Sequence, residues 1–280
     1  MKQAIDRRLF PCNERVAHVS LRGQVDNVQF VEGRLAHVRS SVLGLRRSPC
    51  GDRDRQLLHG AGFLVLDEEG AKGTVFGRAC ADGYVGYVAR DGLEDFRAPS
   101  HRVWSLGAHV YPEPVIKVEP VMTLPFFSVV EATDETESFI EIANGGYIPT
   151  AQVKTVNDLA TDPVEVAERL VGTPYLWGGD SNWGIDCSGL VQLALASAGI
   201  DAPRDSDMQE HNVGTVLDGR DRMRRGDFVF WSGHVGIMVD SEHLVHANAH
   251  HMAVRIEPLE GAAARIQATG GGAIRLRRRI

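Results

Sequence analysis

The chain has 280 residues, of which 43% are hydrophobic and 24% charged, and its formal net charge at pH 7 is -7. This composition is typical of a globular protein, and the length predicts two or three domains of about 100 to 200 residues each. The negative charge balance gives no support to nucleic acid as the main partner. Partners therefore have to be inferred from individual sites.

The N-terminal stretch MKQAIDRRLFPCNERVAHVS carries charges before any apolar run of about 7 to 15 residues, so it lacks the apolar core of a secretory signal. No span of about 20 apolar residues follows, so we expect no membrane segment. The cysteines are sparse and unclustered, which fits neither a disulfide scaffold nor a zinc ribbon. They are Cys12, Cys50, Cys80 and Cys187. We expect a cytoplasmic protein with free thiols.

Charge and spaced apolar positions alternate up to residue 38, which is typical of an N-terminal segment of helical or mixed structure. From about residue 40 to residue 153, short β-forming runs are broken every few positions by Gly, Asp and Asn, which predicts small β-barrels or a sandwich. The passages DGYVGYVARDGL (82–93) and NGGYIPTAQV (144–153) each join a turn, an aromatic residue and an apolar strand. They indicate an internal repeat of about 55 residues. The prolines of HVYPEPVIKVEPVMTLP, between them, predict loops or edge strands.

The passage TDPVEVAERLVGTPY has the signals of a helix that begins at Pro163 with Asp162 as its N-cap and ends before Gly172. A second helix is predicted over 187–198 and ends at Gly199. Because it is apolar on nearly all sides, we expect it in the middle of a domain.

Alternating and β-branched runs follow in GDFVFWSGHVGIMVD and EHLVHANAHHMAVRIEPL, and they predict neighbouring strands of one hairpin. The last passage, AIRLRRRI, alternates apolar residues with arginine. This pattern favours a closing strand with a solvated arginine face over a nucleic-acid patch.

Cys187 stands at the predicted start of the second helix. Unpaired backbone N–H groups at a helix start lower the pKa of a thiol, and only the thiolate is a good nucleophile. The alternative is a buried structural cysteine beside Asp186, with that residue acting only as an N-cap. The cysteine by itself leaves both interpretations open.

A cysteine nucleophile needs a base within hydrogen-bond reach and a third group that orients the base. His234 begins one predicted strand after the turn WSG, and His246 lies on the next strand, so the two side chains can touch. A cysteine ahead of a central helix, followed by histidine and a polar partner on a sheet, is the order of papain-like enzymes. A metal at the histidines is not expected, because they have no acidic or cysteine partner in a matching motif. These histidines are His243, His246, His250 and His251.

The motifs TPYLWGGDSNWGIDCSGLVQ, RRGDFVFWSGHVGIMVD and HLVHA resemble the catalytic domain of the NlpC/P60 family of cysteine peptidases, which act on bacterial cell-wall peptides. The strand-rich region with DGYVGYV resembles two bacterial SH3 (SH3b) domains. The whole layout is similar to cytosolic γ-D-glutamyl-L-diamino-acid endopeptidases of murein-peptide recycling. The resemblance implies an α+β chain in which two small SH3b-like β-barrels precede a papain-like catalytic domain. The expected segments are an N-terminal stretch, two SH3b-like domains and the peptidase domain, at residues 1–38, 39–96, 97–153 and 154–280.

The family pattern implies Cys187 as the nucleophile, His234 as general base and then general acid, and His246 as the residue that orients His234. Tyr175 of TPYLWGG would help the Cys187 backbone N–H to stabilise the oxyanion. The alternative for Tyr175, as for Trp177 and Trp183, is an aromatic residue of the core or the rim.

Substrate binding is implied for Asp186 and Ser188, which in the recycling subgroup hold the free amine of an N-terminal L-Ala. Tyr84 is expected to reach that amine, and its alternative is an ordinary barrel tyrosine. Two positions depart from the family. Phe76 stands where an SH3b strand commonly has tryptophan, and Ala61 stands where the subgroup has an acidic residue. Either Asp186 acts alone or another carboxylate, such as Glu68 or Glu69, replaces the missing one.

The resemblance therefore implies hydrolysis of the γ-D-glutamyl to L-diamino acid bond in murein peptides with a free N-terminal L-Ala. It implies no cofactor, no metal, no nucleic acid and no membrane partner. It leaves open the diamino acid and the oligomeric state. Two alternatives remain: a papain-like amidase or acyltransferase on another substrate, and an SH3b binding protein whose catalytic domain is vestigial. The intact Cys187, His234 and His246 set argues against the second.

Overall fold

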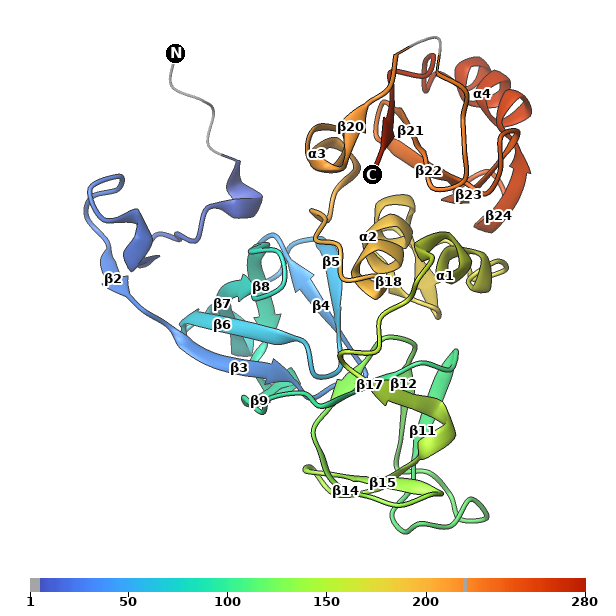
Figure 1. Ribbon diagram of the computed structural model, residues 1–280. Helices are drawn as coiled ribbons and strands as arrows, with labels where there is room; N and C mark the ends of the chain where they lie inside the picture. The colour runs from blue at the N-terminus through green and yellow to red at the C-terminus, as the bar shows by residue number, and fades with distance from the viewer. Residues whose placement is uncertain (1–5, 219–220) are drawn as a thin grey trace. The chain divides into compact units, whose positions relative to one another are not determined.

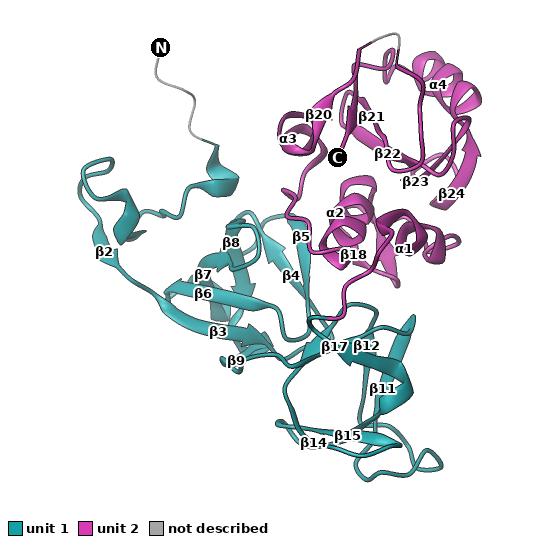
Figure 2. Cartoon of the chain, viewed as in Figure 1, with its two compact units in different colours: residues 1–157 teal, residues 158–280 magenta. Residues whose placement is uncertain are grey.

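The computed structural model describes residues 6–218 and 221–280 and divides into two compact units, residues 1–157 and 158–280 (Figure 2). Each unit is described by itself. Among the described residues, no helix has the length and apolar character needed to cross a membrane.

The first unit begins with the short helix η1 (Arg7–Leu9) and with a parallel pair of strands, β1 (Val16–His18) and β2 (Gln29–Val31), joined through η2 (Val19–Leu21). The N-terminal stretch is thus mixed, as predicted. The next strand, β3 (Arg34–Val38), pairs with β6 and β9 of the first barrel, although the predicted boundary at residue 39 assigns it to the N-terminal stretch.

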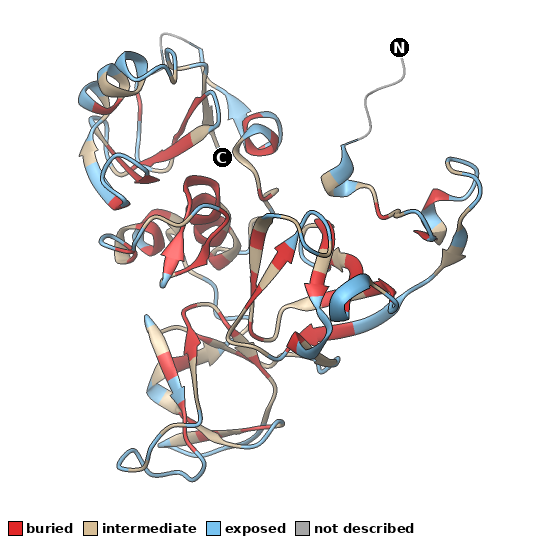
Figure 3. Ribbon diagram, turned by 180° about the vertical axis from the view of Figure 1, so that it is seen from behind, coloured by how far each residue is buried: buried red, intermediate tan, exposed pale blue. Residues whose placement is uncertain are grey.

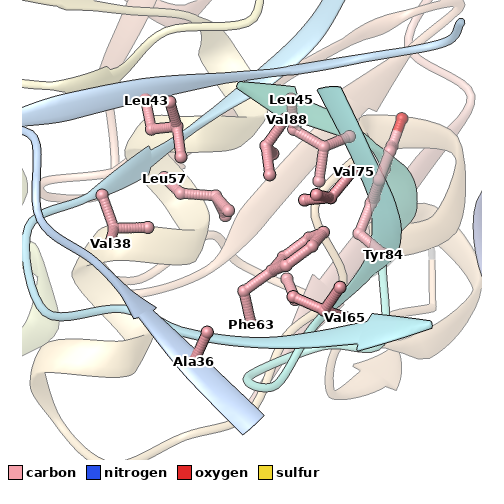
Figure 4. Close-up of a cluster of buried hydrophobic side chains, with 11 residues drawn as sticks. Ala36, Val38, Leu43, Leu45, Leu57, Phe63, Val65, Val75, Tyr84 and Val88 are labelled. Carbon is pink, nitrogen blue, oxygen red and sulfur yellow. The ribbon is translucent and has the colours of Figure 1, made fainter. Parts of the chain in front are cut away.

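The first barrel is one antiparallel sheet with the strand order β5-β4-β8-β7-β6-β3-β9 (Figure 1). Its interior is filled by alanine, valine and leucine side chains and by the Tyr84 ring around Phe63 (Figure 4). Such alternation of inward apolar residues is what short strands with period-two patterning produce. Besides β3, the strands are β4 (Val42–Arg46), β5 (Arg53–Leu58), β6 (Gly62–Asp67), β7 (Thr74–Ala79), β8 (Val85–Ala89) and β9 (Leu93–Asp95), with η3 (Ala71–Gly73) before β7.

A second set of short strands surrounds a separate core that includes Leu124, Ile140 and Ile148, all of them fully buried. The proline-rich passage contributes the loop between β11 and β12 and no helix, as predicted. The strands are β10 (His101–Val103), β11 (Gly107–Val110), β12 (Met122–Pro125), β13 (Val129–Val130), β14 (Ala132–Glu135), β15 (Phe139–Ile142), β16 (Tyr147–Pro149) and β17 (Val153–Thr155).

The two passages that predicted a repeat fold alike. Strand β8, the 3-10 turn η4 (Arg90–Gly92) and β9 follow one another in the first barrel. In the second, β16, η5 (Thr150–Gln152) and β17 follow in the same order. The turn, aromatic and apolar pattern therefore corresponds to the same succession of elements in each barrel.

In the second unit, the described residues form four helices and a six-stranded antiparallel sheet of order β20-β25-β21-β22-β23-β24. Helix α2 is almost entirely buried (Figure 3) and packs against α1, β22 and β23. Helix α4 packs against a sheet cluster that includes Trp231, Met238 and Leu244. The helices are α1 (Pro163–Arg169), α2 (Cys187–Ser197), α3 (Ser206–Asn212) and α4 (Leu259–Ala268). The strands are β18 (Asp180–Ser181), β19 (Gly184–Ile185), β20 (Thr215–Val216), β21 (Phe228–Trp231), β22 (His234–Met238), β23 (His243–Asn248), β24 (Ala253–Pro258) and β25 (Leu276–Arg279).

Both predicted helices are present. The Asp162 side chain accepts the Val164 N–H at 2.8 Å and caps α1. Helix α2 ends at Ser197, and Gly199 follows it with φ +73°, a left-handed conformation that glycine adopts without strain. Helices α3 and α4 were not predicted.

The first barrel depends on its central aromatic side chain. We expect Phe63→Ala to lower the free energy of unfolding by about 3 to 5 kcal/mol, because Phe63 is 0% exposed and its removal leaves a cavity. Urea denaturation of the full chain measures the change. The matched control is Phe96→Ala, which removes the same ring where it is 41% exposed and should cost less than about 1 kcal/mol. Equal losses for the two variants would contradict this description of the barrel core.

Candidate active site

The N-terminus of α2 is held by the side chain of Asp186. Its Oδ1 accepts the Gly189 N–H at 2.7 Å, which makes Asp186 the N-cap and Cys187 the first helical residue. A side chain at position 189 would clash with the backbone, because a Cβ there would lie 2.5 Å from the carbonyl oxygen of Gly179, so this position requires glycine. Cys187 is only 7% exposed.

Asp186 also belongs to a buried ion cluster that was not predicted from the sequence. Arg204, 1% exposed, binds the Asp186 carboxylate through two nitrogens, each at 2.9 Å, and its Nε lies 2.7 Å from Asp180. The same guanidinium donates to the Ser188 hydroxyl at 2.9 Å. The second Asp186 oxygen accepts the Gly178 N–H at 2.8 Å.

This cluster changes what can be expected of Asp186 as an amine ligand. Its two oxygens already accept from Arg204, from two backbone N–H groups and from the Ser188 hydroxyl at 3.3 Å. A substrate ammonium has to share or displace one of these donors. Formally, the two aspartates outweigh the single arginine, so the charge of these three side chains together is negative and suits a cation.

Strands β22 and β23 bring the two predicted histidines together. Trp231 and His234 pair across the two-residue turn Ser232–Gly233 that joins β21 to β22. The Nε2 of His234 lies 2.8 Å from the Nδ1 of His246, which is 0% exposed. The sequence prediction that these side chains touch is thus confirmed by the geometry.

The hydrogen-bond chain continues beyond His246. Its Nε2 lies 2.6 Å from the Oε1 of Glu257 on β24. The Arg265 guanidinium, on α4, donates to both Glu257 oxygens at 2.6 Å. This pair was not predicted from the sequence. The EPLEGAAARIQATGG passage carries a helix signal in its alanines, an early Glu260 and a closing Gly270, and it would have placed Arg265 on a helix after β24.

Burial dominates the electrostatics of the nucleophile and the base. It raises the pKa of the Cys187 thiol to about 12, and the Asp186 charge raises it further. The sulfur accepts a hydrogen bond from the backbone N–H of Val235, and this contact and the Ser188 N–H only partly oppose the rise. The expectation that the helix start lowers the thiol pKa is therefore wrong for the resting state, because desolvation outweighs the helix N–H groups.

Burial also lowers the pKa of His234 to about 3, with a further contribution from His246. A raised thiol pKa and a lowered imidazole pKa both favour the neutral pair at neutral pH. The thiolate then forms when the proton moves to His234 as the sulfur attacks.

Tyr175 lies close enough to Cys187 for the charge of its thiolate to act on the Tyr175 hydroxyl. Its N–H donates to the Met252 carbonyl at 2.9 Å, which ties it to the loop between β23 and β24. Burial raises the pKa of Tyr175, and the Cys187 thiol and Asp186 add to the rise. The hydroxyl keeps its proton and can donate it in a hydrogen bond, as an oxyanion ligand requires.

The other predicted residues lie elsewhere. Tyr84 belongs to the first unit, where it is 2% exposed in the barrel core under the Arg55 guanidinium, and Figure 4 shows its ring among the buried side chains. Its contact with a substrate stays a prediction. Trp177 and Trp183 are exposed at 72% and 46%, so they are rim and not core residues.

The departures from the family pattern have local explanations. Phe76 is buried and packs against Tyr87 with ring centroids 5.0 Å apart and ring planes tilted by 48°, and Ala61 packs against the first barrel core. Glu68 and Glu69 form ion pairs with Arg34 and Arg15. The described residues contain no group of three metal-ligating side chains.

These parts suit acyl transfer. The Cys187 sulfur forms a bond to a carbonyl carbon while its proton passes to His234. The imidazolium then protonates the leaving amine as the C–N bond breaks and a thioester remains. Water releases the acyl group, with His234 as base, and the thiol is restored.

Comparison with known proteins is consistent with this chemistry. A model of the NlpC/P60 family matches residues 172–270, and a model of the bacterial dipeptidyl-peptidase Sh3 domain matches residues 45–93. The chain is 30% identical over 124 residues to the gamma-D-glutamyl-L-lysine dipeptidyl-peptidase of Bacillus cereus. This alignment covers 41% of this chain and 37% of that protein. It is 30% identical over 176 residues to dipeptidyl-peptidase 6 of Lysinibacillus sphaericus, covering 57% and 65%. Both matches span less than two thirds of the relative's own length.

Among solved structures, an NlpC/P60 family protein from Bacillus cereus superposes with a TM-score of 0.73. The alignment covers 88% of this chain and 99% of that chain at 20% sequence identity. At this identity the likeness establishes the fold.

The buried ion cluster predicts a large effect on stability. We expect Arg204→Met to cost about 3 to 5 kcal/mol of unfolding free energy, because it leaves Asp180 and Asp186 without their buried counter-ion. Chemical denaturation measures the loss. The matched control is Arg225→Met, which breaks ion pairs with Asp162 and Glu168 at the surface and should cost less than about 1 kcal/mol. A loss at Arg204 no larger than at Arg225 would contradict the assigned role of the cluster.

Proposed function

We propose that this chain, as a cysteine peptidase of the NlpC/P60 family with an N-terminal bacterial SH3 domain, hydrolyses the γ-D-glutamyl to L-diamino acid bond of murein peptides. The observation that carries the proposal is Cys187 at the start of α2, with its sulfur on the N–H of Val235, the residue that follows His234 of the His234–His246 pair. The name of the Bacillus cereus relative, a gamma-D-glutamyl-L-lysine dipeptidyl-peptidase, supports this bond as the one cleaved.

The substrate carries a free N-terminal L-Ala in this proposal. The support is the negative balance of the Asp180, Asp186 and Arg204 cluster next to the nucleophile. A primary ammonium is favoured near such a cluster, and it sets which amide bond reaches the thiol. Intact cell-wall polymer lacks this free amine and is not cleaved.

We place the reaction in the cytosol, in the recycling of released murein peptides. Fractionation of the source cells with an antibody against the chain tests the location. Recovery of the protein mainly outside the cytosol would leave the bond specificity in place and remove the recycling role.

The first test of the chemistry replaces the nucleophile. Cys187→Ala is expected to abolish hydrolysis of L-Ala-γ-D-Glu-L-Lys and of its diaminopimelate analogue, because the variant lacks the sulfur that attacks the carbonyl carbon. Product masses give the turnover, and circular dichroism shows whether the fold is kept. Appreciable turnover by the variant would contradict the assignment of Cys187. Cleavage of other amides or esters in the same panel, but not of these peptides, would favour the amidase or acyltransferase alternative.

The second test separates the histidines. His234→Ala should reduce kcat by several orders of magnitude, because both proton transfers fail, while His246→Gln should cost less, because an amide can still orient the ring. Steady-state kinetics on one peptide compares the variants. Equal losses would show that the two roles are wrongly assigned.

The third test concerns the amine. Acetylating the L-Ala nitrogen removes its charge, and we expect a loss on the order of tenfold in kcat/KM, the size of one charge-assisted hydrogen bond. A larger loss from an unpaired Asp186 is not expected, because Arg204 already neutralises that carboxylate. If acetylated and free peptides, or intact sacculi, are cleaved equally well, the amine is not recognised.

A further inference from the structure

The arrangement behind His246 defines which nitrogen of each ring carries a proton. Glu257 faces His246 on β23, Arg265 on α4, and His251 of the β23–β24 loop, whose Nδ1 lies 3.8 Å from Oε1. Both Glu257 oxygens accept from the Arg265 guanidinium. A carboxylate bound in this way is ionised and can only accept hydrogen bonds.

The ionised Glu257 carboxylate determines the protonation of the His246 ring, and the His246 ring then determines that of His234. Because Glu257 only accepts, the His246 Nε2 at 2.6 Å has to carry a hydrogen. The Nδ1 of a neutral His246 is then an acceptor, so the His234 Nε2 at 2.8 Å has to donate to it. His234 is left with an unprotonated Nδ1, which is the ring nitrogen available as the base for the Cys187 thiol.

We infer that Glu257, fixed by Arg265, is a positioning residue that sets the tautomers of His246 and His234 so that the His234 Nδ1 can receive the thiol proton. In the resting enzyme Glu257 keeps the hydrogen of His246 on Nε2, and His234 therefore also carries its hydrogen on Nε2. During attack the proton moves from the Cys187 sulfur to the His234 Nδ1, and the carboxylate charge stabilises the imidazolium through the intervening ring. No proton has to reach Glu257, so the carboxylate is unchanged through the cycle.

The fold supports the role at each step. His234, His246 and Glu257 share one face of the sheet, because side chains alternate along each strand and Glu257 lies diagonally opposite His246 in the register of β23 with β24. The same face carries Trp231, whose ring centroid lies 5.6 Å from that of His234, and is covered by α4. Helix α4 therefore supplies both the cover that excludes water and the cation that keeps Glu257 ionised. Burial within this arrangement also keeps water from competing for the His246 ring, which is 0% exposed.

The decisive variant is Glu257→Gln, which keeps the size of the side chain and removes its charge. The Gln amide nitrogen can donate to His246 Nε2 and so permits the opposite tautomer. We expect kcat to fall about 10- to 100-fold with KM changed less than about threefold. In a Ser-His-Asp triad, loss of the orienting carboxylate lowers kcat by up to about 10⁴-fold, and the effect should be smaller here because Glu257 acts on His234 through the His246 ring. The matched control is Glu260→Gln, which changes an exposed carboxylate in the first turn of α4 and should leave both constants unchanged.

Two readouts need no peptide substrate, so they separate a failure of this inference from a failure of the proposed function on which it rests. Carbamidomethylation of Cys187 by iodoacetamide at pH 7, followed by mass, should slow about tenfold or more in Glu257→Gln, because the imidazolium that accompanies the thiolate is less stabilised. The ring ¹⁵N chemical shifts should show His246 protonated at Nε2 in the wild type and a mixture of tautomers in the variant. Unchanged tautomers and an unchanged alkylation rate, with only a lower Tm, would overturn the inference and leave Glu257 a structural residue.

A second variant keeps the question answerable if Glu257→Gln does not fold. The hydrogen bonds from His246 and Arg265 lower the pKa of Glu257, so Arg265→Gln should raise it toward its usual value. Protonated Glu257 cannot hold the His246 Nε2–H, and the variant should therefore lose activity and Cys187 alkylation at a higher pH than the wild type as the medium is acidified. The Arg265 charge also lowers the pKa of His234 directly, whereas the variant leaves the charges of His246 and Asp186 in place. The ring ¹⁵N shifts of His234 and His246 are therefore followed through the same titration, and they assign the acid limb to Glu257 only if the His246 tautomer changes at that pH. An acid limb at the same pH in wild type and variant would contradict the inference.

Discussion

The interaction on which the second unit depends is the set of hydrogen bonds and ion pairs made by the Asp186 carboxylate. It caps α2, receives the Arg204 guanidinium and holds the loop before it through the Gly178 N–H. A helix start, a buried arginine and a glycine loop are thereby joined at one point. Because Cys187 is the next residue, its position follows from contacts that do not involve the sulfur. The Gln209 side chain of α3 adds to this support by donating to the Ser188 carbonyl at 2.9 Å.

The same burial that fixes the nucleophile also makes it weakly acidic. A thiol with a pKa near 12 beside an imidazole with a pKa near 3 is a neutral pair at neutral pH. Its reactivity has to come from groups that stabilise the ion pair during attack, and these are arranged on the sheet side. The His246 ring and the Glu257 carboxylate lie behind the base, and α4 covers them. Catalysis in this unit is thus a property of the helix start and of two strands together.

The barrels illustrate how local pattern and packing differ in what they reveal. The turn, aromatic and apolar motif found twice corresponds to the same strand, 3-10 turn and strand in each barrel, because such turns are determined by neighbouring residues. The burial of the Tyr84 ring, by contrast, depends on packing with residues that are distant in the sequence. Its ring joins Leu45, Phe63 and Val75 in the first core, which no local feature of DGYVGYV indicates.

The sequence by itself determined the features that depend on neighbours in the chain. Asp162 and Asp186 are recognisable caps, the apolar surface of α2 predicts its burial, and the spacing of His234 and His246 around a hairpin predicts their contact. Only the tertiary structure decided the features that depend on distant partners. Arg204 reaches Asp180 and Asp186 from a loop after α2, and Arg265 reaches Glu257 from a helix beyond the last catalytic strand. The thiol pKa belongs to this second group, because desolvation is set by everything packed around the sulfur, whereas the helix start that the sequence reveals is only one of those contributions.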